Sequence, residues 1–418
     1  TLGGIPRTAI PDFWLPKEIV EREIGQILEL GVRAETGTAV GKDIDFNKIL
    51  KEHDACLIAV GASKESGLDI PGCAMMVPAI SFLKRVKSGQ RDGIGARVVI
   101  VGGGGVAFDC AFTAKRLGAA EVHIVCVEGQ DCMCAPPPEI RKADAEGIMV
   151  HNSKMISSVL SKDAKTIGIE YYEISSFEFD EEYCLAVQPV SDEKKFLEAD
   201  FVISAVGGRP DLAFIEDNDK FEFAPNGTLK VDPQTMATSM DKVFACGDVV
   251  SGPSAVAQAV GSGRRTAMAI DRYLKGIRLS EFESVVINKA GQVVIEETSA
   301  KFDPHEVRYD EILNIDYHEK KPRQTTAKLS AEASIHSFEE MDKGFEKDKA
   351  MIEAGRCLHC GHCTACGCCI EDCPGLILAM NSQGPRVVYP DECWHCGCCR
   401  IACPSGAVFY DFPLNMRV

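Results

Sequence analysis

One cysteine run occurs twice near the C-terminus, and this repeat constrains the fold more than any other feature of the chain. The first copy is Cys363-x2-Cys366-x2-Cys369-x3-Cys373-Pro374, and the second is Cys393-x2-Cys396-x2-Cys399-x3-Cys403-Pro404. Three thiolates at a period of three can bind three corners of an iron–sulfur cubane, and the fourth ligand must come from elsewhere. The repeat therefore predicts two [4Fe-4S] clusters and a role in electron transfer.

The spacing also predicts which cysteine belongs to which cluster. In two-cluster ferredoxins the cysteine before proline ligates the other cluster, so the ligation is expected to cross between the copies. The expected ligands are Cys363, Cys366, Cys369 and Cys403 for the first cluster, and Cys393, Cys396, Cys399 and Cys373 for the second. Paired zinc sites are the alternative because CxxC pairs also suit zinc, but a zinc ribbon needs neither a third cysteine at period three nor Cys-Pro.

Four further cysteines lie among the expected ligands. Cys357 and Cys360 continue the period of three upstream. They could ligate a further metal centre, compete with Cys363 for the first cluster, or be spare thiols. Cys368 and Cys398 each precede a third ligand, and we expect both to be packed non-ligands.

Composition narrows the functional class. The chain has 20 cysteines, and no charged-then-apolar export signal is visible, which favours metal-ligating thiols in a reducing cytoplasm over disulfides. The net charge of −17 argues against a nucleic-acid partner, since no basic stripe is present to neutralise phosphates. No apolar run approaches the roughly 18 residues of a transmembrane segment.

A second strong pattern lies in the middle of the chain. A glycine-rich turn with Gly102, Gly104 and Ala107 in a G-x-G-x-x-A arrangement follows a continuous apolar stretch. The expected strand, helix and strand around it are 97–101, 109–117 and 121–127. Such a βαβ unit lets the backbone and the helix N-terminus approach a pyrophosphate, so the pattern predicts an NAD(P)-binding domain. An ordinary glycine-rich turn in an α/β domain is the alternative.

An acidic residue follows the second strand of this unit. Glu128 lies about twenty residues past the turn, where a carboxylate accepts hydrogen bonds from the adenosine ribose 2′-OH. It would repel the additional phosphate of NADP, so the sequence favours NAD(H) over NADP. The alternative is that Glu128 is an ordinary surface acid.

A third pattern resembles a known class of flavoprotein. The run T-x4-V-F-A-x-G-D over 238–248 is similar to the second flavin-binding motif of two-dinucleotide-fold flavoproteins, with Gly247 and Asp248 at its end. The resemblance implies that Asp248 hydrogen-bonds the ribityl or pyrophosphate region of FAD. A helix over 254–267 would then direct its positive end at the flavin. The segments 58–62 and 205–210 look like the two connections between the domains.

Other segments narrow the resemblance to one family. Gly4-Ile5-Pro6, the stretch 13–17, the stretch 337–340 and the stretch 353–358 resemble segments of the glutamate synthase small-subunit family. The chain is identified as a member of that family with a C-terminal two-cluster ferredoxin domain. The resemblance implies an FAD-dependent NAD(P)H oxidoreductase that passes electrons through iron–sulfur clusters. The cofactors supply the chemistry, so no side chain is expected to act as a general acid or nucleophile.

Three features depart from the family pattern. The arginine pair that reads the NADP phosphate is replaced by Val127 and Glu128, and an arginine near the N-terminus is replaced by Trp14. The first FAD motif, a G-x-G-x-x-G turn after an opening strand, is not present in residues 1–40. We therefore expect that the N-terminus is incomplete or that another polypeptide supplies the missing part.

These patterns predict an α/β fold with two dinucleotide-binding, Rossmann-like domains, the first incomplete, and a small α+β ferredoxin-like domain. The expected domains are 1–95 (FAD, first part), 96–210 (NAD(P)), 211–275 (FAD, return), 276–354 (connection and helix) and 355–418 (two clusters). Smaller expectations are a helix at 17–30, a strand near 55–60, a hairpin over 285–295, and a helix from Ser337 with a Ser337-x-x-Glu340 capping box.

The predicted function is electron transfer from NADH through FAD and two clusters to a partner redox protein or complex. Two alternatives remain. One is a non-catalytic electron-transfer subunit with a vestigial flavin site, and the other is the small subunit of a glutamate synthase. The sequence leaves the terminal acceptor, the direction of electron flow and the oligomeric state open.

Overall fold

The computed structural model divides into two compact units. Unit 1 comprises Thr1–Ile277 and Lys328–Lys343, and unit 2 comprises Arg278–Ala327 and Gly344–Val418. The residues that the structure describes are 2–180, 185–215, 221–233, 235–276, 284–287, 293–296, 321–356, 363, 365–381, 384–389, 393–394, 396–404 and 407–408.

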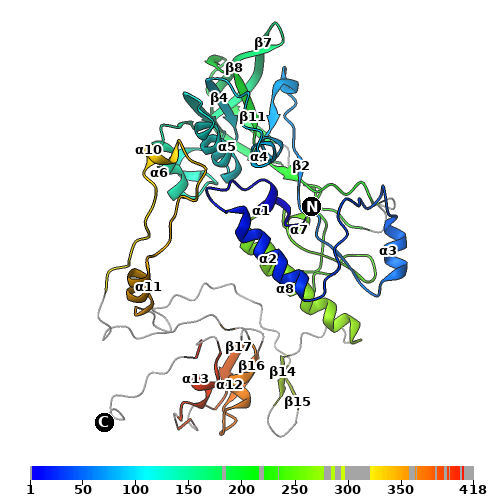
Figure 1. Ribbon diagram of the computed structural model, residues 1–418. Helices are drawn as coiled ribbons and strands as arrows, with labels where there is room; N and C mark the ends of the chain where they lie inside the picture. Colours follow the sequence, from blue (N-terminus) through cyan, green and yellow to red (C-terminus); the bar gives the residue numbers. More distant parts are fainter. Residues whose placement is uncertain are drawn as a thin grey trace. The chain divides into compact units, whose positions relative to one another are not determined.

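The centre of unit 1 is a parallel sheet of five strands in the order β3-β11-β4-β5-β6 (Figure 1). Its strands are β3 (Val77–Pro78), β4 (Arg97–Val101), β5 (Glu121–Val125), β6 (Met149–His151) and β11 (Phe201–Ser204). The last four residues of β4 are apolar and buried, which is typical of a strand covered on both faces. The strand order places the turn after β4 between neighbours on both sides.

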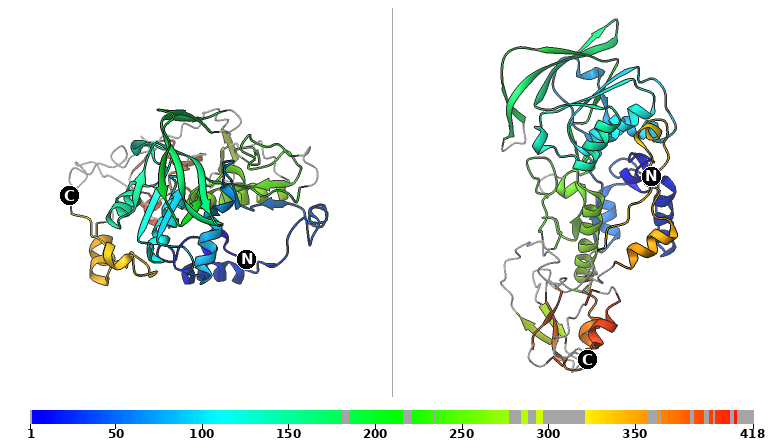
Figure 2. Two further views of the ribbon diagram at one scale, coloured as in Figure 1. Left: turned by 90° about the horizontal axis from the view of Figure 1, so that it is seen from above. Right: turned by 90° about the vertical axis from the view of Figure 1, so that its left-hand side faces the viewer.

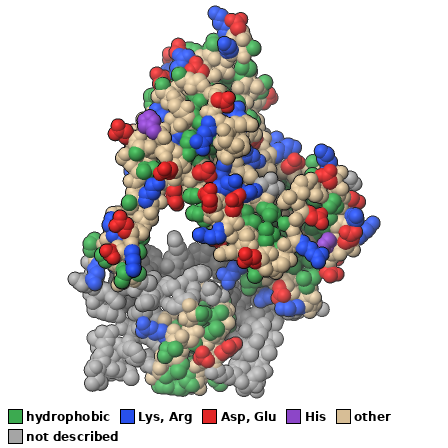
Figure 3. Space-filling view, viewed as in Figure 1, with side chains coloured by type: hydrophobic (Ala, Val, Ile, Leu, Met, Phe, Trp, Pro, Cys, Tyr) green, Lys and Arg blue, Asp and Glu red, His purple; other side chains and the backbone are tan. Residues whose placement is uncertain are grey.

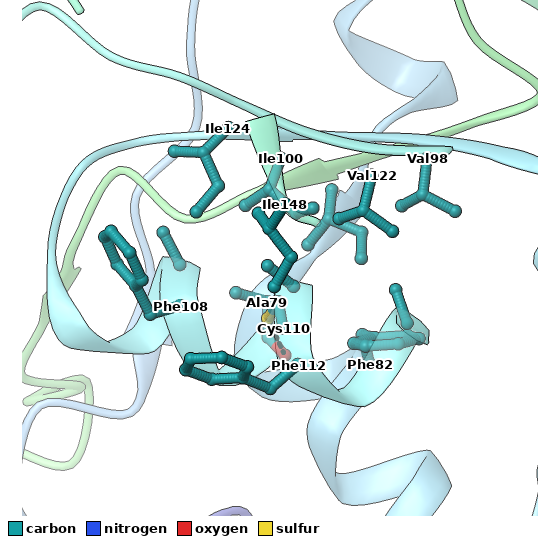
Figure 4. Packing of buried hydrophobic residues seen from close by; sticks show 14 of the residues in the cluster. Ala79, Phe82, Val98, Ile100, Phe108, Cys110, Phe112, Val122, Ile124 and Ile148 are labelled. Atoms are coloured by element: carbon teal, nitrogen blue, oxygen red, sulfur yellow. Dashed lines mark hydrogen bonds between the residues drawn. The ribbon is translucent and has the colours of Figure 1, made fainter. Parts of the chain in front are cut away.

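Helices cover one face of this sheet. Phe82 of α4 (Ala79–Lys87) and Phe108 and Phe112 of α5 (Gly105–Arg116) are fully buried against Ile100 and Ile124 (Figure 4). Helix α6 (Pro137–Ala145) packs next to α5. Burying a large apolar side chain contributes about 2 kcal/mol, so this core holds α5 firmly on β4 and β5.

An antiparallel sheet covers the other face. Its strands are β7 (Lys154–Lys162), β8 (Lys165–Phe179), β9 (Leu185–Pro189) and β10 (Lys195–Glu198). Ile156, Val159 and Ile169 of this sheet are buried against Val99 and Val101 of β4. The long strands β7 and β8 extend beyond the helices (Figures 1 and 2).

A second part of unit 1 surrounds a short parallel pair, β1 (Cys56–Ile58) and β13 (Val243–Ala245). Its helices are α3 (Phe46–Glu52), α7 (Asp248–Ser251) and α8 (Val256–Leu274). Helix α1 (Gly4–Thr8) instead contacts α4 of the five-stranded sheet, and α2 (Lys17–Glu29) contacts α1. Phe46, Phe221 and Leu229 form its small core with the two strands. The strands β2 (Lys64–Glu65) and β12 (Gly208–Arg209) pair with each other and connect this part to the five-stranded sheet.

The segment 328–343 packs on the helical face of the five-stranded sheet. Its structure differs from one prediction. The segment 328–343 contains a short helix, α10 (Ala331–Ser334), and no helix begins at Ser337. Ser337 instead accepts a hydrogen bond from the Glu339 N–H (3.1 Å), while Met341 is buried and its N–H donates to the Phe13 carbonyl (3.1 Å). The predicted helix is wrong because tertiary packing of this segment overrides the local capping pattern.

Unit 2 contains short elements. They are β14 (Ser284–Ile287), β15 (Val293–Glu296), α11 (Lys347–Ala354), α12 (Cys368–Glu371), β16 (Leu378–Asn381), β17 (Gly384–Val387) and α13 (Cys398–Ala402). β14 pairs antiparallel with β15, which confirms the hairpin predicted over 285–295. β16 pairs antiparallel with β17, and α12 lies beside α13.

The predicted fold class is confirmed: unit 1 is α/β with a parallel sheet core. The helix expected at 17–30 is α2, and the strand expected near 55–60 is β1. The helix after the glycine-rich turn begins at Gly105, earlier than expected, and α8 continues beyond Ala267. The expected domain boundaries stay predictions.

Among the described helices, none is both long and apolar enough to cross a bilayer.

Candidate functional site

The glycine-rich turn after β4 has three positions with three different constraints. Gly102 has φ +128°, and a Cβ there would clash with the Ala205 carbonyl oxygen. Gly104 has no heavy atom within 4 Å of an added Cβ, so the space over it is open. Ala107, in the first turn of α5, is fully buried. A dinucleotide-binding turn requires the same three properties: a tight turn at the first position, room for a pyrophosphate at the second, and close packing of the helix on the strand at the third.

Glu128 lies against this turn. A Cβ added to Gly103 would be 2.6 Å from Glu128 Oε2, so the carboxylate packs directly on the turn's second glycine. Glu128 is half-buried, and Oε2 is a buried atom that makes no hydrogen bond within the described structure. An unpaired buried acceptor costs about 1–3 kcal/mol, which a ligand hydroxyl at this position would offset. The residues present therefore fit the adenosine ribose of a dinucleotide.

The second flavin motif places Asp248 at the first turn of α7. Gly247 precedes it with φ +74°, a conformation that favours glycine, and Asp248 Oδ1 accepts a hydrogen bond from the Ser254 hydroxyl (2.8 Å). Helix α8 begins soon after; its N-cap is Ala255, which has no capping side chain, and Gln258 Oε1 accepts from the Ala255 N–H (3.1 Å). Unpaired N–H groups at a helix start attract negative charge. The motif thus offers a carboxylate and a positive helix end close together in the chain.

The edge of β1 beside this motif is open in the described structure. β1 pairs with β13 on one side. Leu57 in β1 is 41% exposed, and Val60, two residues after the end of β1, is 46% exposed. A cavity of about 600 Å3 runs along β1 and is lined also by Phe46 and Phe214. An unpaired strand edge next to exposed apolar side chains is a place where a further strand can add.

In unit 2 the structure brings together cysteines that the sequence assigned to one cluster. Burial, with a smaller contribution from the neighbouring thiolates of Cys363, Cys403, Cys366 and Cys399, raises the pKa of Cys369 to about 11. Three of these four neighbours are its predicted co-ligands, and Cys403 comes from the other copy of the repeat. A buried thiol with a raised pKa holds its proton, and a metal ion bound there would supply the positive charge that ionises it.

Backbone N–H groups point at the sulfur atoms in a repeated pattern. Ile377 N–H donates to Cys373 Sγ (3.4 Å), and Ala407 N–H donates to Cys403 Sγ (3.2 Å). Both donors lie four residues after the cysteine that precedes proline. Hydrogen bonds to the sulfurs are one of the means by which proteins set cluster potentials. The repeat in sequence is therefore also a repeat in local geometry.

The described cysteines do not form a site for a single metal ion. Within the described residues, no three His, Cys, Asp or Glu side chains converge closely enough to bind one ion. A tetrahedral zinc site needs its sulfurs within about 4 Å of each other, since each Zn–S bond is about 2.3 Å. A four-iron cubane holds its ligands farther apart. The ligand assignments stay predictions, and Cys357 and Cys360 lie outside the described residues.

Sequence reasoning missed a buried ion pair behind the coenzyme turn. Arg116 at the end of α5 donates to both carboxylate oxygens of Glu146 (2.9 and 3.1 Å), and both side chains are fully buried. The guanidinium also lies 4.2 Å from the centroid of the Phe13 ring. The pair fixes α5 to the residue that follows α6. The sequence feature that could have indicated this ion pair is an arginine at the end of a mostly apolar helix.

The surface of unit 1 carries charges of both signs. On the face drawn in Figure 3, Lys and Arg side chains are intermixed with Asp and Glu side chains among the described residues. That face presents no single-sign field for a charged polymer to follow.

Comparison with known proteins gives the family. The family described as pyridine nucleotide-disulphide oxidoreductase matches residues 22–263. The chain is 31% identical over 361 residues to the NADP(+)-dependent formate dehydrogenase subunit beta of Moorella thermoacetica, a match that covers 85% of this chain and 49% of that protein. It is 32% identical over 287 residues to a putative glutamate synthase [NADPH] small chain of Cereibacter sphaeroides, covering 65% of this chain and 68% of that protein.

The fold has neighbours among solved structures as well. Thioredoxin reductase of Lactococcus lactis matches with a TM-score of 0.51 and 19% identity, covering 66% of this chain and 88% of that one. At this identity the likeness shows the fold alone.

The chain belongs to the pyridine nucleotide-disulphide oxidoreductase family, which confirms the expected class of FAD- and pyridine nucleotide-linked oxidoreductases. Within it, the chain is similar to the glutamate synthase small chains, as the sequence motifs indicated. It spans about half the length of the first curated relative named above.

Proposed function

We propose that this chain belongs to an oxidoreductase that passes electrons from NADH through FAD and two [4Fe-4S] clusters to a partner redox protein. The observation that carries the proposal is the carboxylate of Glu128 on Gly103 of the coenzyme turn, together with crossed cysteines around Cys369. The first marks a pyridine nucleotide site, and the second a cluster site in the same chain.

At the coenzyme site the residues of the chain bind and orient the dinucleotide. The open space over Gly104 admits a pyrophosphate, and the N-terminus of α5 donates N–H groups to it. Glu128 accepts from the ribose 2′-OH and repels a phosphate there. On this ground we propose NAD(H) as the coenzyme, although the names of the two relatives cite NADP(+) and NADPH.

At the flavin site Asp248 and the start of α8 would hold FAD, which when bound accepts a hydride and releases electrons singly. A glycine-rich turn for its pyrophosphate is not among the described residues. We place a further βαβ unit along the open edge of β1, where Leu57 and Val60 are exposed and a cavity is present.

At the cluster site the eight cysteines would hold the two clusters, which carry single electrons. The N–H donors of Ile377 and Ala407 stabilise negative charge on the sulfurs and so favour the reduced state. The relatives' printed names describe a subunit and a small chain. We therefore propose a protein partner for the electrons, in the reducing cytoplasm that clustered thiolates require.

A second candidate function rests on the open edge of β1. If no βαβ unit adds there, the chain binds no FAD and is an electron-transfer subunit that uses its clusters alone. A glutamate synthase small-subunit role is favoured by the likeness to such small chains. Co-purification of a large glutaminase-bearing subunit would establish it.

Coenzyme binding tests the first step. We expect calorimetry on the full chain to give at least about tenfold tighter binding of NADH than of NADPH, a difference of about 1.4 kcal/mol. Glu128→Ala should reduce that preference by weakening NADH and strengthening NADPH. Glu121→Ala, which alters an exposed acid at the start of β5, is the matched control. Equal affinities in the wild type would exclude the NAD assignment.

A further inference from the structure

The loops that follow β5 and β6 are joined by hydrogen bonds beyond the ends of the strands. Cys126 N–H donates to the His151 carbonyl (3.1 Å), and Lys154 N–H donates to the Cys126 carbonyl (2.9 Å). Each loop is thereby fixed to the other close to the coenzyme turn. Glu128 lies in the first loop, and Asn152 and Ser153 lie in the second.

The peptide carbonyl of Glu128 receives two donors from the second loop. The Asn152 side-chain amide donates to it at 3.1 Å, and the Ser153 N–H donates at 3.1 Å. Ser153 adopts φ +54°, which is uncommon for a residue other than glycine. Such a conformation persists only where the surroundings impose it, and it is most frequent at functional sites.

The two hydrogen bonds to this carbonyl oxygen restrain the backbone from which the Glu128 side chain extends. Oε2 of Glu128 makes no hydrogen bond within the described structure, so that oxygen does not hold the side chain in place. The two hydrogen bonds restrain the backbone at Glu128, from which the side chain reaches Gly103. The Asn152 amide also contacts Cys126 Sγ (3.6 Å), which ties it to the same loop at a second point.

We propose that Asn152 is a positioning residue for coenzyme selection: its amide holds the Glu128 peptide so that the carboxylate meets the coenzyme ribose. This inference rests on the proposed function, in which Glu128 reads that ribose. Asn152 itself touches no coenzyme atom in this account. It acts through Glu128, and its removal should therefore affect the two coenzymes differently.

The test is a comparison of NADH and NADPH binding by calorimetry on the full chain. Asn152→Ala removes one hydrogen bond of ordinary strength, so we expect NADH to bind roughly 3- to 10-fold more weakly and NADPH to bind unchanged or more tightly. Asn152→Asp has the same shape without the donor, and it should reproduce the effect if the donor, not the packing, is responsible. Asn226→Ala is a matched control in another loop, where the side chain accepts from Thr228.

A double-mutant cycle with Glu128→Ala separates action through Glu128 from general damage. In the Glu128→Ala background, Asn152→Ala should leave NADH binding unchanged. An equal loss in both backgrounds, or equal weakening of NADH and NADPH, would overturn the positioning role. If Glu128→Ala alone changes neither affinity, the coenzyme assignment of the proposed function fails. If Glu128→Ala has its expected effect and both Asn152 variants have none, only this inference fails.

Discussion

The parallel-sheet domain of unit 1 and the cysteine region of unit 2 differ in what holds them together. The first encloses large apolar side chains on both faces of its sheet, among them Phe82, Phe108 and Phe112. In the second, the buried apolar residues of the described part are Cys369, Ile370, Cys373, Ile377 and Ala379, and two of these are expected iron ligands. The described core is small, so we expect the proposed clusters to contribute to folding.

The largest expected effect is the loss of a cluster when an expected iron ligand, but not the adjacent cysteine, is substituted. Cys369→Ser should remove one cluster, roughly halving the iron content from about eight atoms per chain, and should unfold the cysteine region, because cluster binding there is coupled to folding. Cys368→Ser alters an adjacent cysteine that is expected not to ligate, and it should keep both clusters. Iron analysis and EPR of the reduced protein measure the difference. Equal iron loss in the two variants would refute the ligand register.

Hydrogen exchange on the Cys369→Ser protein sharpens the comparison. We expect protection to be lost in α12, β16 and β17 and retained in β4 and β5, because the parallel sheet has its own core. Loss of protection in both regions would show that the two depend on each other.

The next effect lies in the apolar domain. Arg116→Met leaves the buried Glu146 carboxylate with only the Lys142 ammonium at 3.6 Å, so unfolding should become easier by about 3 kcal/mol. Urea unfolding followed by Trp14 fluorescence in a Trp394→Phe background measures it, since those are the two tryptophans. Arg116→Met combined with Glu146→Leu should recover much of the loss. Iron content should stay unchanged, in contrast to Cys369→Ser.

A smaller effect depends on pH. Burial raises the pKa of Asp109 on α5 to about 7 from an ordinary 3.8, and Glu139 contributes further. The folded state thus favours the protonated acid, and its stabilising effect is lost as pH rises from about 4 through 7. Asp109→Asn should therefore stabilise the domain at pH 8 by roughly 2 kcal/mol, about half the full value of such a shift because Asp109 is only half-buried.

The control for this prediction is Asp144→Asn, which alters an exposed acid on α6. It should leave the difference in unfolding free energy between pH 4 and pH 8 as it is in the wild type. A gain from Asp109→Asn that is equal at both pH values would contradict the titration of Asp109.

The smallest effect concerns the coenzyme alone. Gly104→Ala places a methyl group in the open space of the turn without meeting protein atoms, so stability should change by less than about 1 kcal/mol. NADH affinity should fall about tenfold, because the pyrophosphate needs that space. Calorimetry together with thermal unfolding checks both parts. A loss of folding would show that Gly104 is structural, as Gly102 is.

Sequence predicted the parts of the molecule whose determinants lie close together in the chain. The β4 strand, its glycine-rich turn and α5 follow one another directly, and the cysteine repeat is likewise local. The hydrogen bond from Asn152 to Glu128 spans 24 residues, and the Arg116–Glu146 pair spans 30. No local period or motif encodes such pairs, because they exist only after the strands and helices have assembled.

The prediction at Ser337 was wrong for a related reason. Its capping pattern is a local signal of modest energy. Burial of Met341 and packing of Phe338 against the core of unit 1 contribute more, and the backbone from Ser337 to Glu340 is not helical. Propensity at that site competes with tertiary contacts that the sequence around it does not reveal.

The central claim is that electrons from a pyridine nucleotide reach the clusters through FAD. Its most direct test is an anaerobic titration of the full-length protein with NADH and then NADPH, following flavin absorbance and the EPR signal of reduced clusters together. We predict that NADH bleaches the flavin and raises the cluster signals while NADPH does little. If dithionite reduces the clusters but neither nucleotide does, and no FAD is bound, the catalytic account is contradicted and the chain is an electron relay.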